Sequence, residues 1–342
     1  LEKIKDFCTK MNIAFYATDA KAQFDSEVID PLVSRRLTAD ASNSCFDCTK
    51  MRVNILYNKM KKLKADYIAT GHYCKIQKNL NSSQYFVHSN NDIESDQSFL
   101  LGGISGDYLK HMILPLGELK KTEVQKIANK FGLNVESSRE QSSFCFKEPE
   151  SYMAMAKKRV PKSMLKEGQI QNAETELYHG DHDGILSHYV GQKNLNFKGL
   201  GPSDVDLEVV GYEFTTGLLM IGKAQMLSHS GFQMVYLKLG SGLDQTRPMA
   251  CFLKSKNSQS YIKCNLYFKN NKTALIECAE EIYPLIHEES FVIFDKETRN
   301  AKVIGVGRVG NIGDFNLIDR AFEFRTSEND EEIVSSSNLF KF

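Results

Sequence analysis

The stretch TKMRVNILYNKMKKLKADYIATGHY, residues 49–73, joins a helical pattern directly to a strand pattern. Apolar side chains in its first part recur at the spacing of one helical face: Val53, Ile55, Leu56 and Met60. The second part, ADYIATGHY, is a short apolar run that ends in polar residues, which is typical of a buried strand. A helix that leads at once into such a strand indicates an α/β fold, in which helices cover a parallel sheet.

The same alternation continues on both sides of this stretch. Residues 1–11 have a helical pattern, and residues 12–20 have an extended one. A further helix is predicted within residues 120–134, with Thr122 as its N-cap and Gly132 just past its end. The first part of the chain is therefore predicted to be an α/β domain with a parallel sheet.

Hairpin patterns complete this outline. One hairpin is expected within residues 74–90, and another within 260–281, where two alternating runs flank the turn residues 270–272. Short alternating strands continue to the end of the chain and predict a β-barrel or sandwich. We divide the chain into an α/β domain, a small central domain, a β-barrel and a polar tail, at 1–164, 165–238, 239–326 and 327–342.

The composition is that of an ordinary soluble globular protein, with 342 residues, 42% hydrophobic and 25% charged. Its 43 basic and 43 acidic residues balance, but residues 1–164 hold 25 basic and 19 acidic ones, an excess of six. Such a basic half suits contact with nucleic acid, although a solvated helix face is the commoner meaning of basic runs. No apolar run is long enough to cross a membrane and the first residues do not resemble a secretory signal, so we expect no membrane partner and an intracellular location.

Cys45 and Cys48, in ASNSCFDCTK, are the most informative of the eight cysteines. Their spacing suits half of a tetrahedral zinc site, but no second Cys-x-x-Cys or His-x-x-x-His pair follows to complete it. In a reducing compartment, cysteines this sparse are thiols, metal ligands or catalytic groups. The pair is therefore a metal clip, a disulfide switch or one half of a site that is completed elsewhere in the chain.

Seven short motifs together resemble the tRNA 2-thiouridine synthases, the MnmA/TrmU family. They are ASNSCFDCTK, ADYIATGHY, SDQSFLL, LPLGELKKTEVQKIANKFGL, REQSSFCF, GDHDGILSHYVGQ and GLG, which stand in the family's order and cover nearly the whole chain. The resemblance implies a nucleotide-binding PP-loop domain, a small central domain and a C-terminal β-barrel. It also implies an enzyme that uses ATP with Mg to adenylate the uracil 2-oxygen of a wobble uridine in tRNA. Sulfur then arrives as a persulfide from an upstream donor protein.

The resemblance also implies roles for individual residues. Cys48 matches the family's nucleophilic cysteine, Cys145 matches its persulfide cysteine, and Gly71 matches the glycine that contacts ATP. The implied tRNA contacts are Asn43, Ser44, Cys45, His72, Ser95, Asp96, Gln97, Lys254 and Lys256. Ser95 replaces a basic residue of the family pattern, and Cys45 stands where many members carry Asp.

One family motif has no counterpart in these residues, the SGGVDSS loop that holds the pyrophosphate of ATP. We expect that the chain lacks the first strand, loop and helix of its gene product, because a parallel sheet without its central strand would leave backbone groups unpaired. The alternative is a protein of the same fold that binds tRNA or carries sulfur without adenylation.

Two further alternatives concern the site and its surroundings. Cys45, Cys48 and Cys145 could hold a [4Fe–4S] cluster with one open iron, in place of persulfide and disulfide chemistry at Cys48 and Cys145. We expect a monomer, because one tRNA could bridge the basic first domain and the barrel. The expected compartment is the cytoplasm, or an organelle if the source is eukaryotic.

Overall fold

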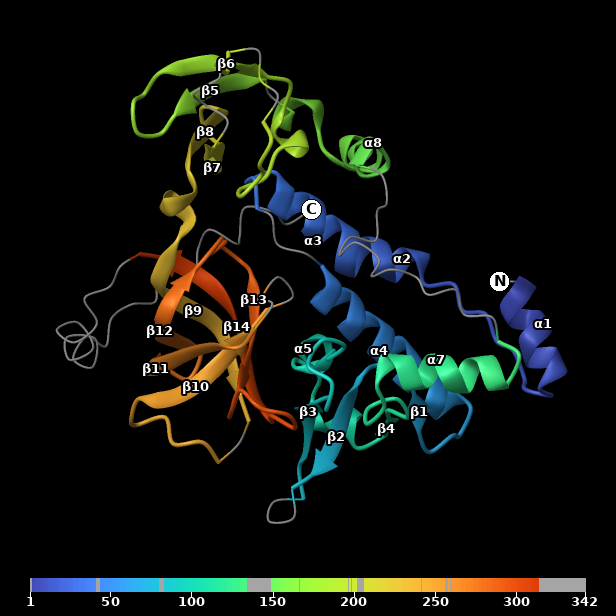
Figure 1. Ribbon diagram of the computed structural model, residues 1–342. Coiled ribbons are helices and arrows are strands. Elements are labelled where there is room, and N and C mark those ends of the chain that lie inside the picture. The colour runs from blue at the N-terminus through green and yellow to red at the C-terminus, as the bar shows by residue number, and fades with distance from the viewer. Residues whose placement is uncertain are drawn as a thin grey trace.

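The computed structural model describes residues 2–40, 44–79, 83–133, 149–165, 167–195, 197, 199–201, 206–240, 242–255, 258 and 260–313. Three groups of elements follow one another along the chain: a mainly helical α/β part, a four-stranded sheet and a closed barrel (Figure 1). No helix among these residues is long and apolar enough to cross a membrane.

The helices of the α/β part surround a short parallel sheet. Their bounds are α1 Glu2–Lys10, α2 Lys21–Phe24, α3 Asp30–Arg36, α4 Cys45–Lys62, α5 Ser98–Leu101, α6 Gly106–Leu109, α7 Lys121–Lys130 and α8 Pro149–Arg159. The π-helical segment Asp25–Ile29 joins α2 to α3, so that the three form one continuous helical stretch. Val28 and Ile29 of this segment are buried, which turns its apolar side toward the core.

The parallel sheet consists of β1 (Ile68–Ala69) and β4 (Met112–Ile113). β1 follows α4 directly, as the sequence predicts, and the parallel pairing confirms the α/β class. The hairpin of β2 (Cys74–Lys78) and β3 (Tyr85–Ser89) comes next and confirms the predicted hairpin. Residues 12–20, expected to be extended as a strand, form no helix or strand.

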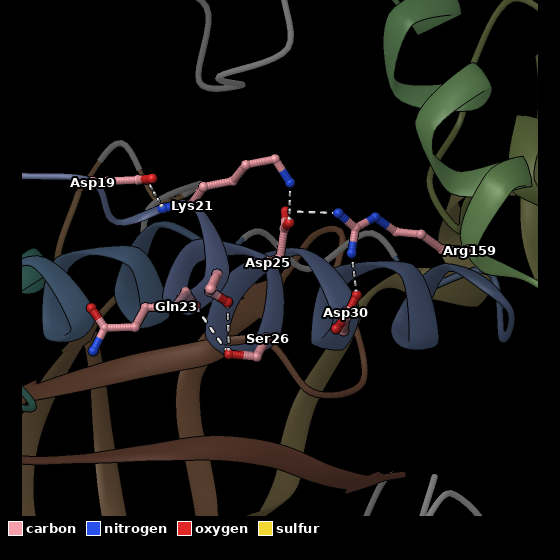
Figure 2. A network of polar contacts seen from close by, with 8 residues as sticks. Asp19, Lys21, Gln23, Asp25, Ser26, Asp30 and Arg159 are labelled. Carbon is pink, nitrogen blue, oxygen red and sulfur yellow. Dashed lines mark hydrogen bonds and ion pairs between the residues drawn. The ribbon is translucent and has the colours of Figure 1, made fainter.

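Arg159, the last residue of α8, ties α8 to the α2–α3 stretch, as Figure 2 shows. Its guanidinium contacts Asp30 Oδ1 at 2.5 Å and Asp25 Oδ1 at 2.7 Å. Lys21 binds the second oxygen of Asp25 at 2.7 Å. The end of α8 is thereby fixed against a helix that lies more than a hundred residues earlier in the chain.

The middle sheet has the strand order β6-β5-β8-β7. Its strands are β5 (Gly168–Asn172), β6 (Tyr178–His182), β7 (Leu207–Glu213) and β8 (Leu218–Lys223). Short 3-10 turns lie near it at Lys162–Met164, Ile185–Ser187 and Ala224–Leu227. Apolar residues of this sheet, such as Ile170, Leu219 and Ile221, pack with α3 and α8 in one core.

The barrel is closed, with the strand order β10-β11-β12-β9-β14-β13. Its strands are β9 (His229–Leu239), β10 (Met249–Lys254), β11 (Ile262–Asn270), β12 (Thr273–Ile282), β13 (Ser290–Phe294) and β14 (Val303–Ile312). The hairpin of β11 and β12 confirms the one predicted within 260–281. β9 pairs with both β12 and β14, so the barrel begins at residue 229 and not at the predicted residue 239.

The barrel and the α/β part share a hydrophobic core. Val53 of α4 and Leu101 of α5 belong to the same buried cluster as the barrel residues Val292 and Val306. Gly102 allows this contact, because a Cβ at that position would meet both methyl groups of Val292 at 2.8 Å. The two parts therefore pack against each other without an intervening solvent layer.

Candidate functional site

The first turn of α4 carries Cys45 and Cys48. Both are half-buried thiols, and their spacing of three residues places them on the same side of the helix. The turn begins where the backbone N–H of Cys48 donates to the carbonyl of Ser44 at 2.8 Å. The amino end of a helix favours negative charge, which suits a cysteine that reacts as a thiolate.

The two residues between these cysteines fix the turn in place. The ring of Phe46 lies so close to Gly103 that a Cβ there would overlap it. Asp47 places one carboxylate oxygen 3.4 Å from Arg35 Nη1 of α3, and the other 3.1 Å from Arg308 Nη2 of β14. Phe46 therefore anchors the turn by packing, and Asp47 anchors it by charge.

Ser44 precedes the turn and is buried, with 8% of its surface exposed. Its hydroxyl oxygen accepts a hydrogen bond from Arg35 Nη2 at 2.8 Å and donates to the carbonyl of Val28 at 3.4 Å. The hydroxyl is thus used to join α3 to the start of α4. The expected tRNA contact by the Ser44 side chain does not agree with this burial.

Gly71 and His72 follow the end of β1, where ligands bind in parallel sheets of this kind. Gly71 is exposed, and a Cβ at this position would make only an ordinary contact of 3.6 Å with Leu116. The hydroxyl of Thr70 lies 2.8 Å from His72 Nδ1. Burial lowers the pKa of His72, and the positive charge of Arg52 on α4 lowers it further, so this ring is neutral at neutral pH.

Asp96 and Lys254 form a buried ion pair between the α/β part and the barrel. Lys254 Nζ lies 3.4 Å from Asp96 Oδ2, and their side chains are 7% and 0% exposed. The carboxylate also accepts hydrogen bonds from Asn90 N at 2.9 Å and from Ser98 Oγ at 2.7 Å. Both charges are thus paired inside the protein in this structure, and the tRNA contacts expected of Asp96 and Lys254 stay a prediction.

The neighbours of Asp96 are more accessible. Gln97 is half-buried, accepts a hydrogen bond from Tyr73 N at 3.1 Å and donates its own N–H to the Tyr73 carbonyl at 2.9 Å. The hydroxyl of Ser95, also half-buried, donates to Asp92 Oδ2 at 2.8 Å. Gln97 is thus hydrogen-bonded to Tyr73, the residue after His72. The two expected tRNA contacts His72 and Gln97 therefore lie on segments that are bonded to each other.

Three of the predicted site residues, Asn43, Cys145 and Lys256, lie outside the described residues. Among the residues that are described, no group of three or more His, Cys, Asp or Glu side chains could hold a metal ion. The [4Fe–4S] alternative needs Cys145 and receives no support from the described part of the chain.

Sequence reasoning missed the arginines that hold the cysteine turn. Arg35 precedes Asp47 by 12 residues and Arg308 follows it by 261, so no local motif joins them. The acidic residue between the two cysteines was the available signal, because a carboxylate in a half-buried helical turn needs a cationic partner.

The chain is similar to known proteins along much of its length. Residues 1–149 match the family model of the tRNA methyl transferase HUP domain. The tRNA-specific 2-thiouridylase MnmA of Clostridium acetobutylicum is 31% identical over 202 residues, which are 59% of this chain and 55% of that protein. The protein of the same name from Symbiobacterium thermophilum is 26% identical over 270 residues, covering 78% of this chain and 68% of that one. The chain is thus similar to proteins named tRNA-specific 2-thiouridylase MnmA.

The residues that match the HUP domain model, 1–149, lie in the α/β part described above. The chain spans about half the length of the first MnmA relatives that it matches, 55% of the one from Clostridium acetobutylicum and 54% of the one from Clostridioides difficile.

Proposed function

We propose that this chain is an ATP-dependent tRNA sulfurtransferase that makes 2-thiouridine at the wobble position. The observation that carries the proposal is the position of Cys48, half-buried in the first turn of α4, in a chain whose relatives are named tRNA-specific 2-thiouridylases. A helix start supports the thiolate that such chemistry needs.

The proposed chemistry exchanges the 2-oxygen of uracil for sulfur. A carbonyl oxygen is a poor leaving group until it carries AMP, so ATP first adenylates it. The terminal sulfur of a persulfide on Cys145 then attacks carbon 2, and AMP leaves with the oxygen. The Cys48 thiolate attacks the Cys145 sulfur, which breaks the persulfide bond, leaves the thiocarbonyl on uracil and forms a Cys48–Cys145 disulfide. A thiol reductant restores both cysteines.

Residues that follow β1, and the segment bonded to them, support the binding steps of this proposal. Gly71 is exposed at the end of β1, where a nucleotide would meet the backbone. His72 is neutral and half-buried next to it, so its ring can donate or accept a hydrogen bond to a base. Ser95 and Gln97 remain proposed tRNA contacts, together with Asn43, Cys45 and Lys256. A persulfide donor protein and a monomeric state complete the proposal.

The test incubates the protein with unmodified tRNA, ATP, Mg and a persulfide donor, and measures 2-thiouridine in the digested tRNA by mass spectrometry. The expected result is product from the wild type, none from Cys48→Ser or Cys145→Ser, and wild-type amounts from Cys8→Ser, a control cysteine on α1. A wild-type chain that binds ATP and tRNA but forms no 2-thiouridine would overturn the proposal. Product from Cys48→Ser would remove the assigned role of that thiol.

A further inference from the structure

Four side chains of alternating charge connect the turn of Cys48 to the barrel. Arg35 of α3 contacts Asp47, Asp47 contacts Arg308 of β14, and Arg308 Nη1 lies 3.2 Å from Glu288 Oε2. Each oxygen of the Asp47 carboxylate thus meets an arginine from a different part of the fold. The carboxylate belongs to the residue directly before Cys48.

The four side chains are mostly buried and still reach solvent. Between 13% and 27% of each side chain is exposed, so solvent screens the network only in part. Exposed ion pairs contribute at most about 1 kcal/mol to stability, and partly buried pairs such as these contribute more when one partner is removed. The first turn of α4 is already held by Phe46 against Gly103, which needs no charge. Besides its part in holding the turn, the network fixes the direction and the charge of the segment around the thiol.

We infer that Asp47, held between Arg35 and Arg308, is a positioning residue for Cys48, and that the barrel sets the charge around this thiol through Arg308. The inference rests on the proposed function in so far as that function makes Cys48 the reacting thiol. The negative charge of the Asp47 carboxylate disfavours the thiolate form of Cys48, and the positive charges of the two arginines cancel this effect. The barrel is needed at the cysteine turn because it supplies Arg308, one of these two arginines.

The test measures how fast iodoacetamide alkylates Cys48 at neutral pH, without tRNA, ATP or sulfur donor. Tryptic cleavage after Arg36 and Lys50 gives a peptide with both Cys45 and Cys48, and fragmentation in the mass spectrometer tells them apart. Arg308→Gln should slow alkylation of Cys48 by about threefold, because Asp47 loses one of its counter-charges. Asp47→Asn should accelerate it by about threefold, because the opposing charge disappears.

Two controls separate charge from loss of structure. Arg308→Lys keeps the charge and should restore most of the wild-type rate, and Arg247→Gln, an exposed arginine of the barrel part, should leave it unchanged. A loosened turn would change the rate in the same direction for Arg308→Gln and Asp47→Asn. Changes of the same sign, or equal rates in all variants, would overturn the inference. If the chain makes no 2-thiouridine, the proposed function fails, but the alkylation rates still decide this question.

Discussion

The side chains of Asp96 and Lys254 show how burial changes the meaning of a motif residue. Both were expected to contact tRNA, yet each finds its partner in the other part of the fold, 158 residues away in the sequence. Asp96 is further held by two backbone N–H groups, those of Asn90 and Ser98. These two residues connect the domains, which no local pattern of the sequence indicates.

We predict that Lys254→Met lowers the free energy of unfolding by about 3–5 kcal/mol, because it leaves the Asp96 carboxylate buried without its counter-charge. Urea denaturation measures this change. Below the unfolding transition, the affinity for tRNA in a filter-binding assay should stay within about twofold of the wild type. Lys263→Met, an exposed lysine on β11, serves as the matched control. Wild-type stability together with weak tRNA binding would restore the RNA-contacting role of Lys254.

We also predict that the protein loses stability as the pH falls. Burial lowers the pKa of His72, His88 and His188 from the usual 6.5, and in each case burial is the largest cause. The unfolded chain therefore binds protons at a higher pH than the folded one does. The stability that these neutral rings provide is present above pH 6.5 and is lost as the pH falls toward their lowered values.

Urea denaturation at about pH 7.5 and about pH 5.5 checks this sign. The free energy of unfolding should be smaller at the lower pH, and His72→Gln should reduce the difference, because one depressed group has been removed. If the free energy of unfolding changes by the same amount between the two pH values in the wild type and in His72→Gln, His72 does not contribute to the loss of stability.

At the scale of single elements, the spacing of apolar residues predicted most of the helices and strands discussed above. The helix after Cys45, the two hairpins and the strand before Gly71 agree with their patterns, because each is defined by neighbours within a few residues. The helix predicted within 120–134 begins at Lys121, with Lys120 and not Thr122 at its N-cap. Residues 12–20 have the composition of a strand but no strand partner among the described residues, and side-chain pattern alone cannot supply one.

The candidate site was predictable only in part. Sequence motifs indicated Cys48, Gly71 and His72, because these residues stand in short stretches with a fixed spacing. They did not indicate Arg35 or Arg308, nor that Ser44 is buried, because those properties depend on how distant segments pack. Chemistry-bearing residues can thus be read from local patterns, whereas the residues that orient them cannot.

The contact between α4 and Gly103 gives a prediction at this scale. Gly103→Ala should lower the free energy of unfolding by about 1–3 kcal/mol, because the new methyl group displaces the Phe46 ring. Urea midpoints measure the effect. Gly106→Ala is the control, since a Cβ there would meet only the Tyr85 carbonyl oxygen, at 3.8 Å. If Gly103→Ala is as stable as the control, Phe46 does not anchor the turn.

At the scale of the whole molecule, the shared core makes the barrel part of the cysteine site. Val292 and Val306 of the barrel lie in the cluster that also contains Val53 of α4. Arg308 adds a charged contact on the same side of the barrel, close to Asp47. The first turn of α4 is therefore supported by residues from the beginning and from the end of the described chain.

We predict that Val292→Ala weakens the α/β part as well as the barrel. Loss of two buried methyl groups costs about 2 kcal/mol, and the cavity lies between the two parts. Hydrogen exchange followed by mass spectrometry should show faster exchange in α4 and α5. Val309→Ala, which removes the same groups from the barrel's own core, should speed exchange in the barrel strands alone. Equal protection of α4 in the two variants would contradict a shared core.

The strand order of the barrel has a consequence for how the chain is made. β9 is the first barrel strand along the chain, yet one of its two neighbours is β14, the last strand that is described. The chain leaves the ribosome from its amino end. The backbone groups on one edge of β9 therefore stay unpaired until β14 has been synthesised. Arg308 arrives on that same strand. Cys48 leaves the ribosome early, but its surroundings are complete only when translation has passed residue 312. Until then the barrel exposes an unpaired strand edge and an apolar face, to which chaperones or other chains can bind.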